Sequence, residues 1–234
     1  MKMILSVHQP QYIPWLGYFD KIDKSDCFIF LDNVQYKHRE YQNRNKIRTK
    51  DGWIWLTVPV ISKGLGRQNI CDVQINNEFK WQSEHLKSLE NYYNRAPFFK
   101  DHYHFFERVY SLKWEKLADL NIHIIKYILE QLGIDTPLYY ESKIGTTSQS
   151  TKRIIEVCKK LKADVYLSGI GGKGYLEEEQ FSQAGIKLEY QNFIHPEYSQ
   201  QYMKEKDSFQ GYMSIIDLLF NEGPQSIRIL RGET

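Results

Sequence analysis

The sequence predicts an α/β protein of the Rossmann-like type, with a mostly parallel sheet and helices on both of its faces. Residues 2–32 read in order as a strand, a short helix and a second strand. Near the other end of the chain, residues 151–221 alternate between helical and strand patterns again. Such alternation is typical of parallel strands joined by helical crossovers, and each crossover should be right-handed.

The first strand–helix–strand unit is predicted from two short apolar runs. Residues 2–7 and 26–32 have the continuous apolar character of strands that are buried on both faces. Residues 14–22 between them are predicted to form a short helix, because Pro14 is tolerated in a first helical turn.

The second alternating region supplies the other elements of the predicted sheet. A helix is expected over residues 151–162, because its apolar residues fall on one face. A strand follows at 164–168, a helix begins at about residue 175, and a strand covers 186–193. The last helix is expected over residues 212–221, which are apolar nearly all round.

The middle of the chain is expected to be a largely helical insertion. Short strands are predicted at residues 53–60 and 71–75, and a helix at 81–93. The clearest helix covers residues 114–132, where apolar residues recur every three or four positions, and Gly133 should end it. We therefore expect one α/β domain over residues 1–234, with an inserted helical segment at about 60–135.

Composition limits the class of partner and the compartment. The chain has 234 residues and a formal net charge of +2, which argues against nucleic acid as a partner. Cys27, Cys71 and Cys158 form no CxxC motif, which fits reduced thiols in a cytoplasmic protein. No apolar run approaches the 18 residues of a membrane span, and the first residues do not resemble a signal peptide.

Polar residues follow several of the predicted strands. Ligands of open α/β sheets bind beyond the carboxyl ends of the strands. His8 and Gln9 follow the first strand, Asp32 follows the second, and Ser168 and His195 follow later ones. We expect them to share one pocket, in which the prolines that come after His8 hold it in a fixed pose. The alternatives are a structural histidine and a turn-capping aspartate.

A glycine-rich segment follows the strand at 164–168. Residues 169–174, GIGGKG, contain four glycines and Lys173 between a strand and a helix. This arrangement favours a backbone nest for an anion, although the Walker pattern is absent and a plain loop is the alternative.

Two further polar features are candidates for the site. Residues 42–45, QNRN, are dense in amides, and Arg44 has the forked guanidinium that binds carboxylate or phosphate; a solvated loop is the alternative. Asp217 lies among apolar residues of a predicted helix, so it should be buried with a partner. That partner is either structural or a catalytic histidine.

These features give a provisional set of roles. His8 or His195 would act as a general base, because imidazole titrates near neutral pH, and Asp32 or Asp217 would orient it. No metal site and no cofactor are predicted. The ligand-binding residues are expected to be Gln9, Tyr12, Trp15, Gln35, Asn43, Arg44, Ser168, Gly169, Lys173 and Tyr175.

Seven separated motifs, in order, resemble the WbqC-like protein family between about residues 4 and 223. They are HQPQYIPWLGYFDKI, LDNVQY, QNRNKI, WLTVPV, YLSGIGGKGYL, FIHPEYSQ and SIIDLLFNEG. Members of this family occur with genes for O-antigen and other bacterial surface polysaccharides. The resemblance implies a transferase that moves an acyl or aminoacyl group to a nucleotide-linked amino sugar. Its partners would be a nucleotide-sugar or sugar-phosphate ligand and an acyl or aminoacyl donor, which a carrier protein would deliver in one variant of the scheme.

Two alternatives are open, and the first of them comes from a looser resemblance. The first strand, helix and second strand are similar to the opening of HIGH-type nucleotidyltransferases and of pantothenate synthetase. In those proteins a histidine follows the glycine at the helix start, whereas here Tyr18 follows Gly17. The alternatives are an ATP-using nucleotidyltransferase or ligase, and a non-catalytic nucleotide-sugar-binding protein.

Overall fold

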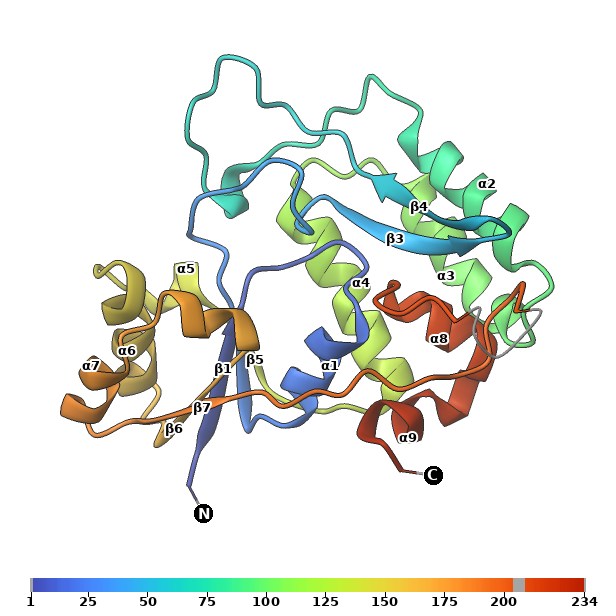
Figure 1. Ribbon diagram of the computed structural model, residues 1–234. Helices are drawn as coiled ribbons and strands as arrows, with labels where there is room; N and C mark the ends of the chain where they lie inside the picture. The colour runs from blue at the N-terminus through green and yellow to red at the C-terminus, as the bar shows by residue number, and fades with distance from the viewer. Residues whose placement is uncertain (1, 204–208, 234) are drawn as a thin grey trace. The chain divides into compact units, whose positions relative to one another are not determined.

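The computed structural model describes residues 2–203 and 209–233, which form two compact units (Figure 1). Each unit is assembled from three separate stretches of chain. The sheet unit comprises Met1–Pro10, Gly17–Val34 and Ile134–Ile194. The helical unit comprises Gln11–Leu16, Gln35–Gly133 and His195–Thr234. The chain leaves and re-enters each unit, and a single domain with one inserted segment stays a prediction.

The sheet unit contains a five-stranded, all-parallel sheet, which confirms the predicted fold class. The strand order is β5-β2-β1-β6-β7. The strands are β1 (Ile4–His8), β2 (Cys27–Phe30), β5 (Leu138–Tyr140), β6 (Val165–Ser168) and β7 (Lys187–Tyr190).

Helices cover both faces of this sheet (Figure 1). They are α1 (Leu16–Asp23), α5 (Glu141–Ile144), α6 (Ser150–Lys160) and α7 (Glu178–Gln183). On one face, Leu5 and Val7 of β1 belong to a core that α6 and α7 complete. On the other face, the Tyr18 ring of α1 lies 5.5 Å from Phe28 of β2. Successive side chains of each strand point to opposite faces of the sheet, so every second residue contacts the same layer of helices.

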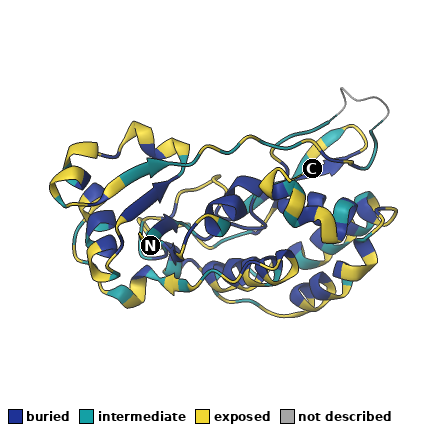
Figure 2. Ribbon diagram, turned by 90° about the horizontal axis from the view of Figure 1, so that it is seen from below, coloured by how far each residue is buried: buried dark blue, intermediate teal, exposed yellow. Residues whose placement is uncertain are grey.

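The central strands form because their residues are apolar on both faces. β2 and β6 are buried along their whole length, and β1 is buried except at its ends (Figure 2). β5 was not predicted, since three residues are too few to show a strand pattern. Its place is fixed by pairing, with Phe28 of β2 opposite Leu138.

The helical unit contains the insertion that the sequence predicts, together with a small antiparallel hairpin. Its helices are α2 (Trp81–Tyr93), α3 (Phe99–Ser111), α4 (Leu117–Leu132), α8 (Ile215–Glu222) and α9 (Ser226–Arg231), with short 3₁₀ turns at Ile70–Asp72 and Gly223–Gln225. α4 ends at Gly133, which adopts the left-handed conformation with φ of 65°. In the parts of the chain that the structure describes, no helix has the length and apolar character to cross a membrane.

Two segments of this unit differ from the prediction. Residues 71–75 were expected to form a strand, but Ile70–Asp72 form a 3₁₀ turn and only isolated bridges follow. The basic segment around Arg44 is a strand, β3 (Arg44–Thr49), paired with β4 (Gly52–Thr57). The sequence of β3 lacks the usual alternation of polar and apolar residues, because one of its inward-facing residues is the polar Asn45, which is fully buried.

Candidate functional site

The sheet unit has a topological switch point between β1 and β6. The chain moves from β1 to β2 on one side and later places β6 on the other side of β1. Register pairs His8 with Phe30 of β2, and Ser6 with Leu167 of β6. His8 and Ser168 therefore end neighbouring strands, and Asp32 lies two residues beyond β2. In doubly wound sheets this is where ligands bind.

His8 is half-buried at the end of β1. Its Nδ1 lies 3.1 Å from the carbonyl oxygen of Gln9, and its ring meets Tyr18 edge-on at 4.9 Å. Burial, and then the charge of Lys21, lower the pKa of His8 to about 3. The imidazole is therefore neutral, and the Gln9 contact assigns its proton to Nδ1. Nε2 carries the lone pair and makes no hydrogen bond within the described chain.

We expect the imidazole of His8 to stay unprotonated between pH 8 and pH 5. A His8 ring signal in a two-dimensional NMR titration should not move over this range. The same titration in urea should show the histidines of the unfolded chain changing near pH 6.5. A His8 signal with a midpoint near 6.5 in the folded protein would contradict the burial of this ring.

Lys21 on α1 is a member of this site that the sequence analysis missed. Its side chain is only 2% exposed, and Nζ donates a hydrogen bond to the carbonyl oxygen of Val7 at 3.1 Å. No carboxylate of the described residues forms an ion pair with it. Burial lowers the pKa of Lys21 to about 7. The sequence contains one indication that Lys21 is buried: it lies three residues after Tyr18, on the apolar face of a short helix.

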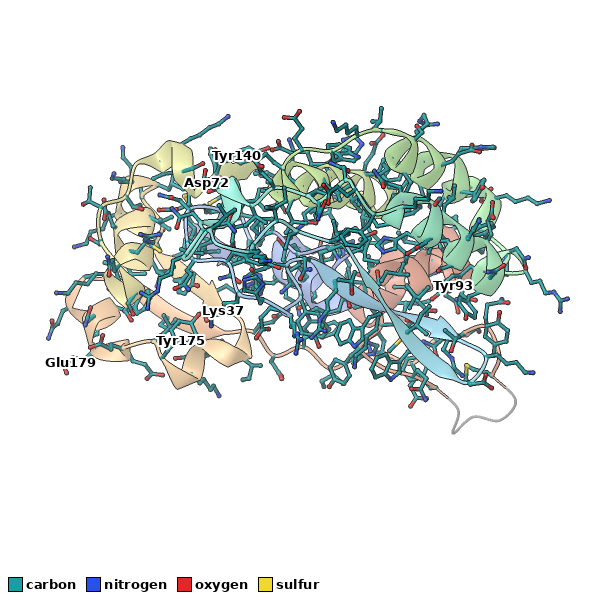
Figure 3. All side chains as sticks on the ribbon, turned by 90° about the horizontal axis from the view of Figure 1, so that it is seen from above. Lys37, Asp72, Tyr93, Tyr140, Tyr175 and Glu179 are labelled. Carbon is teal, nitrogen blue, oxygen red and sulfur yellow. The ribbon has the colours of Figure 1, made fainter. Side chains whose placement is uncertain are left out.

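The glycine-rich segment forms a compact 3₁₀ helix, η2 (Ile170–Gly174), directly after β6. A Cβ atom on Gly172 would lie 2.1 Å from the Oγ of Ser168, so close packing requires this glycine. Lys173 is exposed, and its Nζ lies 5.2 Å from the centre of the Tyr190 ring. Tyr175, which ends the turn, is 65% exposed (Figure 3).

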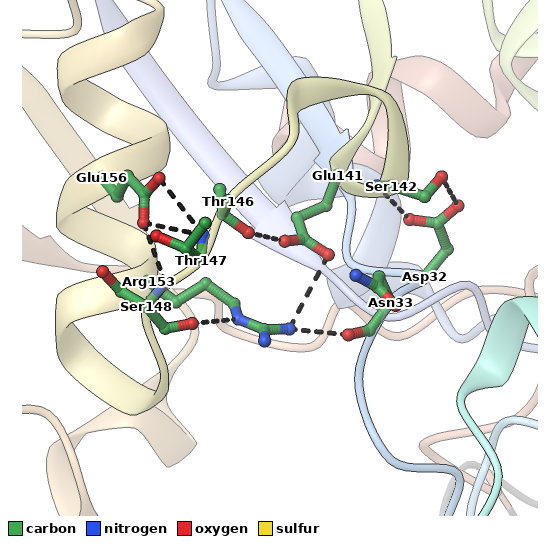
Figure 4. A network of polar contacts seen from close by, with 9 residues as sticks. All are labelled: Asp32, Asn33, Glu141, Ser142, Thr146, Thr147, Ser148, Arg153 and Glu156. Carbon is green, nitrogen blue, oxygen red and sulfur yellow. Dashed lines mark hydrogen bonds and ion pairs between the residues drawn. The ribbon is translucent and has the colours of Figure 1, made fainter.

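Asp32 has a structural partner instead of the histidine that was expected. Its carboxylate accepts the Ser142 backbone N–H at 2.9 Å and the Ser142 hydroxyl at 2.6 Å (Figure 4). It thereby caps the first turn of α5. Next to it, Arg153 donates to the carbonyl of Asn33 at 2.6 Å and lies 3.8 Å from the buried Glu141. This network fixes the chain after β2, and a role of Asp32 in orienting a histidine stays a prediction.

Asp217 of the helical unit is fully buried, as expected, and its partners are not histidines. It accepts hydrogen bonds from Tyr93 at 2.7 Å, Tyr198 at 2.9 Å and Gln200 at 2.7 Å. Tyr93 is labelled in Figure 3. Burial raises the pKa of Asp217, and the three hydrogen bonds and the charge of Arg48 oppose that shift. These contacts support the structural alternative for Asp217, and a role in orienting a catalytic histidine stays a prediction.

His195 has both ring nitrogens engaged. Nδ1 lies 2.8 Å from the carbonyl oxygen of Pro196, and Nε2 accepts the backbone N–H of Tyr212 at 3.1 Å. Its lone pair is therefore used, which weakens its candidacy as a base. β7 ends at Tyr190, and His195 belongs to the helical unit, so a pocket shared with His8 stays a prediction.

Other predicted ligand residues of the helical unit differ in accessibility. Tyr12 is fully buried, and its hydroxyl contacts His85 at 2.8 Å, so it is a core residue here. Asn43 is buried and donates to the carbonyl of Val58 at 2.9 Å. Gln35 is exposed.

The outer face of the β3–β4 hairpin combines cations with aromatic rings. The Arg44 guanidinium lies 4.2 Å from the centre of the Trp55 ring, and Nζ of Lys46 lies 4.2 Å from that of Trp53. Trp53 is 41% exposed. Trp15, half-exposed in the same unit, lies 5.6 Å from the ring of Tyr212. Such a surface suits a sugar ring or a base that carries negative charge.

Two other kinds of site were searched for in the described residues. No group of three or more histidine, cysteine or acidic side chains there is placed to hold a metal ion. A groove of about 450 Å³ includes Phe79, Leu86 and Tyr110 in its lining. None of the residues predicted for the site lines it, so we give it no role.

The fold is that of an α/β protein with a five-stranded parallel sheet. In open sheets of this class, ligands bind at a switch point. Residues 9–229 match the WbqC-like protein family, and the chain belongs to it. A relative named "Uncharacterized protein Rv1507c", from Mycobacterium tuberculosis, is 33% identical over 228 residues, which are 97% of each chain. No solved structure matches the chain.

Proposed function

We propose that the chain is a cytoplasmic transferase that moves an acyl or aminoacyl group to the amine of a nucleotide-linked amino sugar. The product would enter a bacterial surface polysaccharide. The observation that carries this proposal is the neutral imidazole of His8 at the switch point, with Nε2 unbonded within the described chain. The lone pair on Nε2 is placed to accept the proton that the acceptor amine loses.

The reaction assigns a task to each group of this edge. The sugar amine attacks the carbonyl carbon of the activated donor, a C–N bond forms, and the bond from that carbon to the leaving group breaks. Nε2 of His8 takes the proton that the amine releases. Lys173 and the glycine-rich segment after β6 would bind the diphosphate of the nucleotide.

A second candidate is a protein that binds a nucleotide-sugar without turnover. It is favoured by the low pKa of His8, since a base with a pKa of about 3 accepts a proton poorly at neutral pH. The aromatic and cationic face of the hairpin also suits sugar binding.

Mass spectrometry of a panel of nucleotide-linked amino sugars, each incubated with activated acyl and aminoacyl donors, tests the proposal. The wild-type protein should add the mass of one acyl or aminoacyl group to the sugar amine. His8→Ala should lower this turnover by about 10²–10⁴-fold, as expected for loss of a general base.

His195→Ala is the matched control, because the lone pair of His195 is already used by the backbone. Its turnover should stay within a few-fold of wild type when both proteins are shown to be folded by circular dichroism. Binding without any mass change across the panel would favour the second candidate. A folded His8→Ala protein with full turnover would remove His8 from the chemistry.

A further inference from the structure

Lys21 of α1 is unusual because its ammonium group is buried in the sheet unit and forms no ion pair with a carboxylate of the described residues. Lys21 is 2% exposed, whereas Lys24, in the turn directly after α1, is paired with Asp20 at 2.6 Å and its side chain is 50% exposed. Lysine is almost never fully buried unless it is paired. One hydrogen bond, to Val7, leaves two of its three donors for another acceptor.

The position of the Lys21 ammonium group indicates where this further acceptor would lie. Nζ bonds the carbonyl of the residue before His8, at the end of β1. It also lies 3.9 Å from the position that a Cβ atom on Gly169 would take, at the end of β6. Gly169 is half-exposed and has no side chain that would cover Nζ from the carboxyl edge. The ammonium therefore lies between the two strands that define the switch point.

We propose that Lys21 is the cation that binds a phosphate group of the ligand between the ends of β1 and β6. This inference rests on the proposed function, since it places the diphosphate of a nucleotide at that edge. An oxygen of the phosphate would accept from Nζ past Gly169, and the buried setting strengthens the contact because little water screens it.

Binding should carry a proton with it. Burial lowers the pKa of Lys21 to about 7, so most of the amine is neutral at pH 8. A phosphate beside it favours the ammonium form, and the complex should take up close to one proton at pH 8 and almost none at pH 6. Among the groups near Lys21, His8 can also gain a proton. Asp20 is paired with Lys24 and Gln191, and Ser168 and Gly169, at the end of β6, have no ionisable side chain.

Isothermal titration calorimetry with inorganic pyrophosphate, ADP and UDP tests the proposal. Titrations at pH 8 in two buffers of different ionisation enthalpy give the number of protons taken up. Wild-type protein should show uptake, whereas Lys21→Met should bind about 10- to 100-fold more weakly with no uptake. Lys24→Met, in the exposed turn directly after α1, should behave as wild type. Uptake that persists in Lys21→Met would assign the proton to His8 and overturn the proposal.

Gly169→Ala keeps the test valid if Lys21→Met fails to fold. The backbone of Gly169 has φ of −65° and ψ of 157°, which any residue adopts, and the new methyl would stand 3.9 Å from Nζ. It should weaken binding of the same probes several-fold, and wild-type affinity in a folded Gly169→Ala protein would overturn the inference.

The outcomes separate this inference from the proposed function. Equal affinity of wild type and folded Lys21→Met would overturn the role of Lys21 and leave the transferase proposal standing. Proton-linked binding that is lost in Lys21→Met, without any transfer in the mass-spectrometric assay, would support Lys21 and reject the reaction. Failure of wild type to bind any of the three probes would overturn both.

Discussion

Replacing Asp217 by alanine should destabilise the protein by about 3–5 kcal/mol, the range typical of removing one partner of a buried charged network. The carboxylate accepts from Tyr93, Tyr198 and Gln200, and each donor left without a partner costs roughly 1–3 kcal/mol. The loss also reaches β3, because the Tyr93 hydroxyl accepts the backbone N–H of Arg48 at 2.8 Å. Urea unfolding followed by circular dichroism measures the change.

Two variants calibrate this expectation. Asp217→Asn should cost less than Asp217→Ala, because the amide keeps an acceptor oxygen and removes the burden of a buried charge. Asp119→Ala removes an exposed acid from the first turn of α4, the position that Asp217 holds in α8, and should cost less than about 1 kcal/mol. An Asp217→Ala protein that unfolds at the urea concentration of Asp119→Ala would contradict the buried network.

The parts of the fold that were predictable are those with a local signature. β1, β2 and β6 are continuous apolar runs, and α4 combines an apolar period with a terminating glycine. β3 was not predictable, because its inward position 45 is polar and is satisfied from outside the strand. The Asn45 side chain donates to the carbonyls of Tyr12 and Ile13, about thirty positions earlier in the chain.

The candidate site divides in the same way. The apolar run before His8 predicted that this residue follows a strand. The rule that ligands bind at the carboxyl edge of parallel strands then made His8 a candidate for the site. The sequence analysis did not identify Lys21, because a lysine in a short amphipathic helix is normally exposed to solvent. The burial of Asp217 was predictable from its apolar neighbours, but its bond to Tyr93 joins residues 124 positions apart. Pairings across such distances leave no local pattern.

The second large effect is expected at Gly223, which ends α8 with φ of 49° and ψ of −121°, a conformation that side chains rarely adopt. A Cβ atom there would lie 2.4 Å from ring atoms of Phe98, which is held in place by its backbone N–H bond to Phe220 at 3.0 Å. Gly223→Ala should therefore add backbone strain of about 1–3 kcal/mol and overpacking of about 1–3 kcal/mol.

Gly133→Ala separates these two contributions, since Gly133 also has a positive φ, of 65°, but a Cβ atom there meets nothing within 4 Å. It should cost only roughly 1–2 kcal/mol, the penalty of a left-handed residue. The steric part is isolated further by a double-mutant cycle with Phe98→Ala, which opens the space that the methyl needs. Gly223→Ala should cost less by about 1 kcal/mol or more in the Phe98→Ala background, because only the backbone strain remains. Equal costs in both backgrounds, measured by urea unfolding, would show that Phe98 does not pack on Gly223 and that strain alone accounts for the loss.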